Sequence, residues 1–232
     1  MTHFSKTRGR GIHFPRLYDF IMFALTKGHR DAYRRAVLDA VKIRSGDSVL
    51  DVGCGTGDQV ILAKQMSGPS GTVVGVDISA DMLAVARRKA RASNVDVSFH
   101  CADAAHLPAE AERFDVVMLV TVMHMVPEVD RAACLAEASR VLKPGGRLLV
   151  VDYAGEVRSR RSLVSRHKLH GAFDLDRTTP SLAEYNLNVL QRDSLGWLDL
   201  HFVLAIKPEL TGNASSYLGT SVAKGDGKSL AI

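Results

Sequence analysis

Three acidic residues stand around a glycine-rich turn, and their spacing indicates a site for a cationic ligand. Asp51 lies at the end of one apolar segment, Asp58 follows glycines at alternate positions, and Asp77 ends a second apolar segment twenty residues after Gly57. Glycines permit positive φ and close approach of the backbone to a ligand. The carboxylates attract an ammonium or sulfonium group, and one at Asp77 can accept both hydroxyls of a ribose. The pattern therefore predicts a positively charged ribonucleoside.

A dinucleotide fits this turn poorly. The dinucleotide fingerprint needs a third glycine, which would fall at Asp58 or at Val60. A carboxylate at the start of the following helix would also repel a pyrophosphate, because helix N-termini favour anions. A dinucleotide oxidoreductase therefore remains an alternative that Asp58 argues against.

Five segments resemble, in order, the motifs of the class I methyltransferases that use S-adenosylmethionine. The segments are Val49–Gly57, Gly75–Ser79 with Met82, Cys101–Pro108, Phe114–Val117 and Arg140–Leu148. The resemblance covers about residues 45 to 152 and implies that S-adenosylmethionine is the cofactor. It implies a role for ten residues: Asp51, Gly53, Gly55 and Thr56 at the methionine part, Asp77 at the ribose, Ile78 and Met82 on the adenine face, Asp103 and Ala104 at the adenine edge, and Val120 at the end of the fourth strand.

The alternation of apolar strand and helix patterns predicts a Rossmann-like α/β fold. We expect a doubly wound, mostly parallel sheet with helices on both faces, in which ligands bind beyond the carboxyl ends of the strands. The expected units are an N-terminal arm and helical lid (1–44), the methyltransferase domain (45–207) and a flexible tail (208–232). A helix is expected at about 181–193. Only about ten residues then remain between Gly196 and Lys207, so we expect a shortened C-terminal sheet edge, which a second subunit could complete in a homodimer.

Helical periodicity from 13 to 41 predicts two lid helices. Tyr18-Asp19 followed by Gly28-His29-Arg30 resembles the opening segment of the methyltransferases of ubiquinone and menaquinone biosynthesis, where that segment caps the cofactor. The alternative is that Tyr18 and Phe20 only pack the helix pair.

His124 is the first candidate for a catalytic base, because it interrupts an apolar segment at the mouth of the predicted site and histidine suits proton transfer near neutrality. His29 and Tyr18 on the lid follow. A structural histidine beside the cofactor is the alternative for His124, and the quinone-pathway enzymes usually carry arginine at this position. Asp152 and Tyr153, at the end of the fifth strand, would line the acceptor pocket, or Asp152 would cap the strand.

Composition bounds the remaining classes. The 232 residues, 46% hydrophobic and 24% charged, suit one large globular domain. Three widely spaced cysteines predict neither disulfides nor a metal site and favour a reducing, cytoplasmic location, and no secretory signal or membrane span is recognised. A net charge of +5 is too small to indicate nucleic acid. The basic residues between Arg158 and Lys168 predict a solvated helix face, an anion-recognising pocket wall or peripheral membrane contact.

The sequence thus predicts an S-adenosylmethionine-dependent methyltransferase acting on a small-molecule acceptor. The lid resemblance favours a phenolic or quinol-type ring, methylated on oxygen or carbon. A phospholipid amine N-methyltransferase and a non-catalytic S-adenosylmethionine-binding protein remain alternatives.

Overall fold

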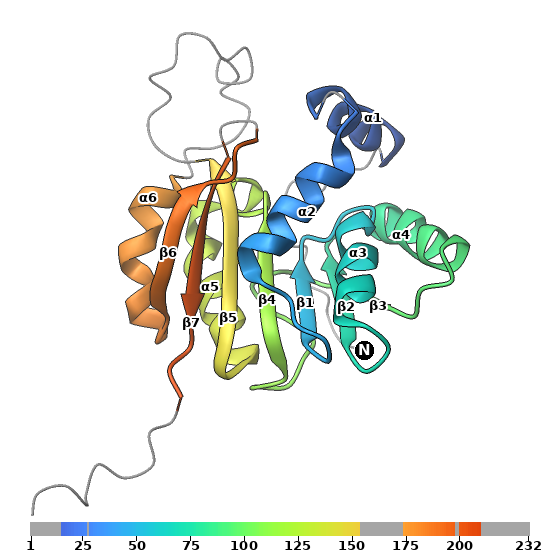
Figure 1. Ribbon diagram of the computed structural model, residues 1–232. Coiled ribbons are helices and arrows are strands. Elements are labelled where there is room, and N and C mark those ends of the chain that lie inside the picture. Colours follow the sequence, from blue (N-terminus) through green and yellow to red (C-terminus); the bar gives the residue numbers. More distant parts are fainter. Residues whose placement is uncertain (1–14, 27, 154–173, 198–199, 210–232) are drawn as a thin grey trace, which may run out of the picture.

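The computed structural model describes residues 15–26, 28–153, 174–197 and 200–209 (Figure 1). The expected arm before residue 13, the basic residues between Arg158 and Lys168 and the tail beyond residue 209 lie outside the described residues. In the described part of the chain, no helix is long and apolar enough to cross a membrane.

The centre of the molecule is a seven-stranded sheet in the order β3-β2-β1-β4-β5-β7-β6. The first five strands pair in parallel, and β7 and β6 add to one edge in antiparallel fashion. The strands are β1 (Ser48–Val52), β2 (Thr72–Asp77), β3 (Ser98–Cys101), β4 (Phe114–Val120), β5 (Leu142–Tyr153), β6 (Asn188–Ser194) and β7 (Leu200–Ile206). The strand order reverses between β1 and β4, the position at which open α/β sheets bind ligands. The predicted doubly wound sheet is confirmed.

The C-terminal edge differs from the prediction. The helix expected at 181–193 is wrong: a 3-10 helix, η3 (Thr179–Tyr185), ends there and β6 follows. Every residue of β6 is exposed, so the strand has no buried face and its sequence lacks the apolar alternation that identifies strands. The expected shortened edge is wrong for the same reason, since β6 precedes Gly196 and completes the sheet. The argument for a second subunit that supplies a missing strand therefore falls.

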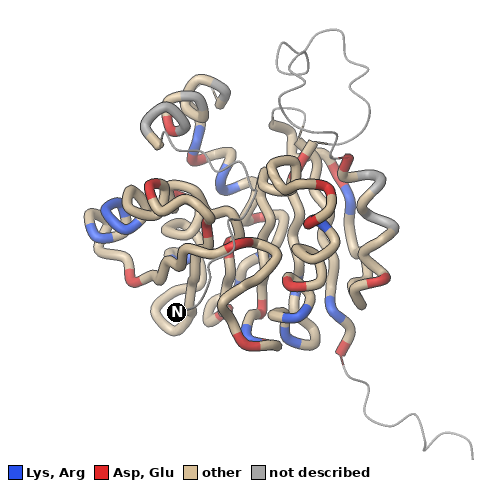
Figure 2. Tube along the Cα trace, turned by 180° about the vertical axis from the view of Figure 1, so that it is seen from behind, with Lys and Arg blue, Asp and Glu red and all other residues tan. Residues whose placement is uncertain are grey.

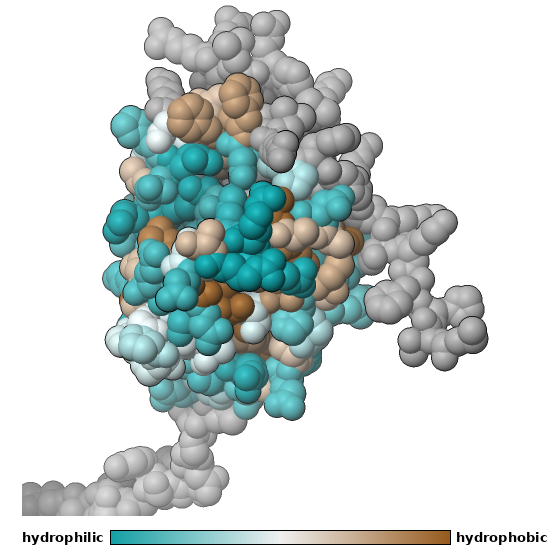
Figure 3. Space-filling model, turned by 90° about the vertical axis from the view of Figure 1, so that its right-hand side faces the viewer, coloured by the Kyte–Doolittle hydropathy of each residue, from teal (hydrophilic) through white to brown (hydrophobic). Residues whose placement is uncertain are grey.

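Two helices precede the sheet, α1 (Pro15–Leu25) and α2 (Arg30–Val41), and α1 lies beyond the carboxyl ends of the parallel strands (Figure 1). Acidic and basic residues are interspersed over α1, α2 and the nearby α4 (Ala80–Ala92) (Figure 2). Apolar side chains gather at the α1 end of the face in Figure 3, above a largely hydrophilic surface. On α1, Phe20 is 67% and Phe23 is 49% exposed, and the Arg30 guanidinium lies 5.6 Å from the Phe23 ring centroid.

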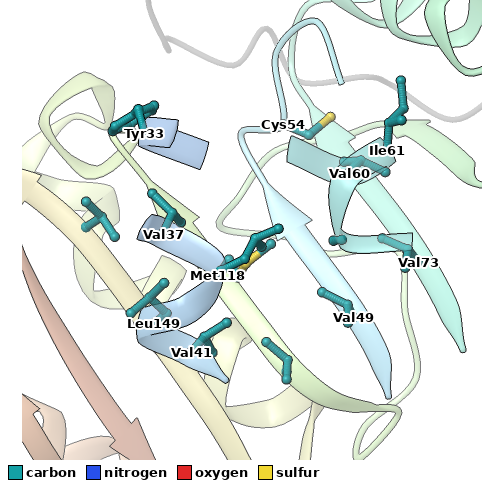
Figure 4. Close-up of a cluster of buried hydrophobic side chains, with 14 of the residues drawn as sticks. Tyr33, Val37, Val41, Val49, Cys54, Val60, Ile61, Val73, Met118 and Leu149 are labelled. Carbon is teal, nitrogen blue, oxygen red and sulfur yellow. The ribbon is translucent and has the colours of Figure 1, made fainter. Parts of the chain in front are cut away.

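The core has two layers because successive side chains of each strand point to opposite faces of the sheet. On one face α2, α3 (Asp58–Ser67) and α4 pack on the sheet, and Figure 4 shows Val37, Val60 and Val49 in this layer. On the other face α5 (Glu128–Val141), α6 (Leu175–Thr178) and η3 contribute to a second buried cluster, which includes Leu50 and Val52 of β1. The glycine-rich turn thus follows a strand, β1, whose side chains are buried on both faces of the sheet.

A buried ion pair fastens α2 to the sheet. The Arg147 guanidinium of β5 lies 2.6 Å from the Asp47 carboxylate and donates to the carbonyls of Val41 and Lys42 at the end of α2. Both charged side chains are about nine-tenths buried. Removing one partner would leave the other charge buried without compensation.

We therefore expect Arg147→Ala to lower the free energy of unfolding by about 3 kcal/mol in chemical denaturation. Lys143→Ala is the control, because Lys143 pairs with Asp115 on a part of the surface where both side chains are a third or more exposed. That change should cost no more than about 1 kcal/mol. Equal effects of the two substitutions would contradict an anchoring role for Arg147.

Candidate functional site

The glycine turn follows β1 as the sequence predicts. Gly53, Gly55 and Gly57 all adopt positive φ, between 54° and 81°. A Cβ on Gly53 would lie 2.5 Å from a methyl carbon of Val122, and one on Gly57 would lie 2.7 Å from the Ala86 Cβ. Glycine is therefore required here both by the backbone conformation and by packing.

A cavity opens beyond the carboxyl ends of β1, β2 and β4. Its lining includes eight of the ten predicted cofactor residues: Gly53, Gly55, Asp77, Ile78, Met82, Asp103, Ala104 and Val120. Asp51 and Thr56 line a smaller cavity beneath the lid, and both cavities include Gly53, Val120 and Thr121. The structure thus brings the predicted residues together around one turn.

Asp77 is held by the turn that it faces. Its Oδ2 accepts the Gly55 N–H at 2.8 Å and its Oδ1 accepts the Ser79 N–H at 2.8 Å. Burial raises the pKa of Asp77, and these backbone donors oppose that effect. The carboxylate is therefore oriented before any ligand arrives.

Asp51 is a buried carboxyl group with a raised pKa. It is 2% exposed, and burial, followed by the charge of Asp77, raises its pKa to about 8. No hydrogen bond to this carboxyl group is recorded among the described residues. A cation in the adjoining cavity would stabilise its ionised form.

The raised pKa makes stability depend on pH. The folded protein holds the Asp51 proton more tightly than the unfolded chain, whose carboxyl has a pKa of about 3.9. The stabilising contribution of protonated Asp51 is therefore complete below about pH 4 and is lost as the pH rises to about 8. Asp51→Asn does not ionise, so it should match the wild type near pH 4 and exceed it increasingly up to pH 8, by at most about 1.4 kcal/mol for each pH unit.

This pH dependence is checked by denaturant titrations of the wild type and of Asp51→Asn at several pH values. The exposed Asp39→Asn on α2 is the control and should track the wild type. A constant difference between Asp51→Asn and the wild type across the range would contradict a raised pKa.

The cavity also has lining residues that the sequence did not single out. Asp103 Oδ1 accepts the Ala105 N–H at 2.9 Å, which fixes the predicted carboxylate. The additional lining residues come from the segment after β4 and the start of α5: Val122, Met125, Val126, Pro127 and Asp130. Sequence analysis assigned them no role because none of the five motif segments covers residues 122–130. The strand ends at Val120, as expected, and Thr121 has a φ of +53°.

Asp58 does not face the ligand site as an uncompensated charge. Its Oδ2 lies 2.7 Å from Arg34 of α2 and 2.9 Å from Lys89 of α4. Lys89 also pairs at 2.9 Å with Asp19 of the lid helix α1, and the Thr56 hydroxyl donates to Asp19 at 2.8 Å. The interpretation of Asp58 as an attractor of the cationic ligand is therefore replaced by a role in tying the lid to the glycine turn.

This network should hold α1 closed over the turn. We expect Asp19→Ala to increase hydrogen–deuterium exchange in α1 about fivefold, which corresponds to about 1 kcal/mol for a partly exposed ion pair. Asp31→Ala is the control. That side chain is 92% exposed, and its contact with Arg34 is long, at 3.7 Å, so the pair should contribute little. Unchanged exchange in Asp19→Ala would show that packing alone holds α1.

The three predicted catalytic residues are placed differently from one another. His124 lies in a 3-10 turn, η1 (Met123–Met125), between cavity residues on either side, and its ring pairs with Asp152 at 2.8 Å. His29 is exposed at the start of α2 and lines neither of these cavities. The side chain of Tyr18 lies outside the described residues. The catalytic roles of all three remain predictions.

Comparison with known proteins places this geometry in a family. Residues 49–146 match a family profile described as a methyltransferase domain. This region is a methyltransferase domain. It includes the glycine turn, Asp77, Asp103 and His124.

Curated relatives are 34% to 39% identical to this chain over the aligned segment. They include the demethylmenaquinone methyltransferase of Lactobacillus johnsonii, 34% identical over 137 residues, which are 58% of this chain and 55% of the relative. The ubiquinone/menaquinone biosynthesis C-methyltransferase UbiE of Pseudomonas paraeruginosa is 39% identical over 139 residues, 59% of this chain and 54% of the relative. The chain thus spans little more than half the length of these curated relatives.

Solved structures agree on the fold of the domain. A SAM-dependent methyltransferase from Aquifex aeolicus superposes with a TM-score of 0.65 at 19% identity and covers 83% of this chain and 98% of its own. Geranyl diphosphate C-methyltransferase from Streptomyces coelicolor superposes with a TM-score of 0.66 at 18% identity, over 82% and 84% of the two chains. At this identity the likeness establishes the Rossmann-like methyltransferase fold.

Proposed function

We propose that the protein transfers a methyl group from S-adenosylmethionine to a small-molecule acceptor. The observation that carries the proposal is the Asp77 carboxylate, oriented by the Gly55 and Ser79 N–H groups at the mouth of the glycine turn. It stands in one cavity with an apolar wall, Ile78 and Met82, and a second fixed carboxylate, Asp103. That combination suits a ribose, an adenine face and an adenine amino group.

The charges of the site fit this cofactor. Burial raises the pKa of both Asp51 and Asp77, and the charge of Asp77 disfavours ionisation of Asp51 further. A bound sulfonium and ammonium would relieve that cost, whereas a pyrophosphate would increase it. When bound, S-adenosylmethionine supplies an activated methyl group, and the protein has to bind, align and shield the reactants.

For the acceptor we propose a phenolic or quinol-type ring, methylated on carbon or oxygen. The supporting relatives are named demethylmenaquinone methyltransferase and ubiquinone/menaquinone biosynthesis C-methyltransferase. The exposed Phe20 and Phe23 of α1 suit a lipophilic acceptor met at a membrane surface from the cytoplasmic side.

Calorimetric titration tests the cofactor. S-adenosylmethionine and S-adenosylhomocysteine should bind and NADH should not. Asp77→Ala should weaken the first two by about 100-fold, because a hydrogen bond to a charged group contributes about 1.5–3 kcal/mol. Asp39→Ala, exposed on α2, should leave both affinities unchanged. Unchanged affinity in Asp77→Ala would remove Asp77 from the site.

A methyl-transfer assay with labelled S-adenosylmethionine tests the acceptor. The probes compared are naphthohydroquinone, simple phenols and phosphatidylethanolamine vesicles. Labelling of naphthohydroquinone or of the phenols is the expected result. Labelling confined to the vesicles would favour a phospholipid amine methyltransferase, and cofactor binding with no labelling would favour a non-catalytic binding protein.

A further inference from the structure

His124 and Asp152 form a pair at the carboxyl ends of two neighbouring strands. His124 follows β4, Asp152 lies near the end of β5, and the two strands pair in parallel. The His124 Nδ1 lies 2.8 Å from Asp152 Oδ1, and the His124 backbone N–H donates to Oδ2 at 3.2 Å. The pair therefore stands at the same edge of the sheet as the cavity.

Asp152 is fully buried, yet its carboxylate has several donors. Besides the two contacts from His124, the Tyr153 backbone N–H donates to Oδ1 at 2.9 Å. Burying a carboxylate costs several kcal/mol unless hydrogen bonds compensate for the lost hydration. These contacts with His124 and with the Tyr153 backbone fix the position of the Asp152 carboxylate.

A carboxylate beside Nδ1 determines the tautomer of the imidazole. An ionised carboxylate only accepts hydrogen bonds, so the proton of neutral His124 resides on Nδ1 and Nε2 becomes the basic nitrogen. The ring is also held by an edge-on contact with Tyr153, at 5.4 Å between ring centroids. The side chain of His124 is only 8% exposed, so its orientation is restricted.

The backbone before His124 is in a costly conformation. Thr121 has a φ of +53°, and its N–H donates to the Val151 carbonyl at 2.7 Å. A positive φ at a branched residue is rare and persists where the surrounding structure imposes it. This turn places Thr121 and Val122 in the cavity wall, and His124 follows between the wall residues Val122 and Met125.

We propose that Asp152 is a positioning residue that keeps the proton on His124 Nδ1, so that Nε2 can take a proton from the acceptor. The inference rests on the proposed methyl transfer and narrows its substrate class to acceptors that lose a proton from an oxygen, such as phenols and quinols. As a methyl group bonds to the acceptor, the carbon–sulfur electron pair stays on sulfur and one acceptor proton must leave. His124 receives that proton, and the ionised Asp152 stabilises the resulting imidazolium.

The first test needs no substrate. Nitrogen-15 NMR of the ligand-free protein should show His124, assigned by its absence in His124→Gln, with its proton on Nδ1. Asp152→Asn keeps an oxygen for the backbone donors but can present an amide N–H to Nδ1, so it should move the proton to Nε2. A wild-type His124 protonated on Nε2 would overturn the proposal.

The second test varies the acidity of the acceptor at one pH. With unionised naphthohydroquinone, His124→Gln and Asp152→Asn should each lower kcat about 100-fold. With para-nitrophenol, already ionised at mildly alkaline pH, both should stay within about fivefold of the wild type, which also shows that the variants fold. Asp193→Asn, on the exposed strand β6, is the matched control.

Equal losses with both acceptors, or no loss with either, would overturn the proton-transfer role. Failure of the proposed function is recognised separately, because it would appear as absent S-adenosylmethionine binding in calorimetry. The tautomer measured in the ligand-free protein does not depend on that result.

Discussion

The structure depends on the burial of two carboxylates, Asp51 and Asp77, beside a turn made of glycines. Ionised carboxylates resist burial, and here burial raises the pKa of both. Only Asp77 receives backbone N–H donors from the turn and from the start of α4. A positively charged ligand would stabilise the ionised form of both carboxyl groups. Gly53 packs so closely against Val122 that a side chain at position 53 would have no room.

The lid is attached to this site by charge, and to the sheet by a separate anchor. Asp19 reaches the glycine turn through Thr56 and reaches α4 through Lys89. The end of α2 is held by Arg147, which spans from the carbonyls of α2 to Asp47. The two attachments differ in burial: the Asp19–Lys89 pair is partly exposed and the Arg147–Asp47 pair is buried. Opening α1 should therefore cost much less than detaching α2, which allows a lid to move while the sheet stays intact.

The sheet order explains why His124 and Asp152 meet although they are remote in sequence. β4 and β5 are neighbours, although α5 intervenes between them along the chain. Their carboxyl ends bring His124 to Asp152, 28 residues later. The cavity wall, the histidine and the buried carboxylate thereby occupy one short stretch of the same edge. Asp77 and Asp103 lie at the ends of β2 and β3, on the other side of the switch point from β4 and β5.

Sequence alone determined the glycine turn, the acidic residues that follow β1, β2 and β3, and the parallel part of the sheet. These features are local: positive φ requires glycine within a few residues, and strands buried on both faces are continuously apolar. The order of the motifs along the chain was enough to group eight cofactor residues around one cavity.

Tertiary structure decided the rest, because it depends on pairings that no local pattern records. β6 is stabilised by its backbone ladder with β7 while all its side chains face solvent, so its residues carry no strand pattern. Asp58 is indistinguishable in sequence from a ligand-binding carboxylate until Arg34 and Lys89 are folded against it. Asp152 was open to two interpretations, a pocket residue or a strand cap, until the pairing of β4 with β5 set it against His124. For Asp58 and Asp152 the partner comes from a distant segment, and only the fold brings the two side chains within a few ångströms.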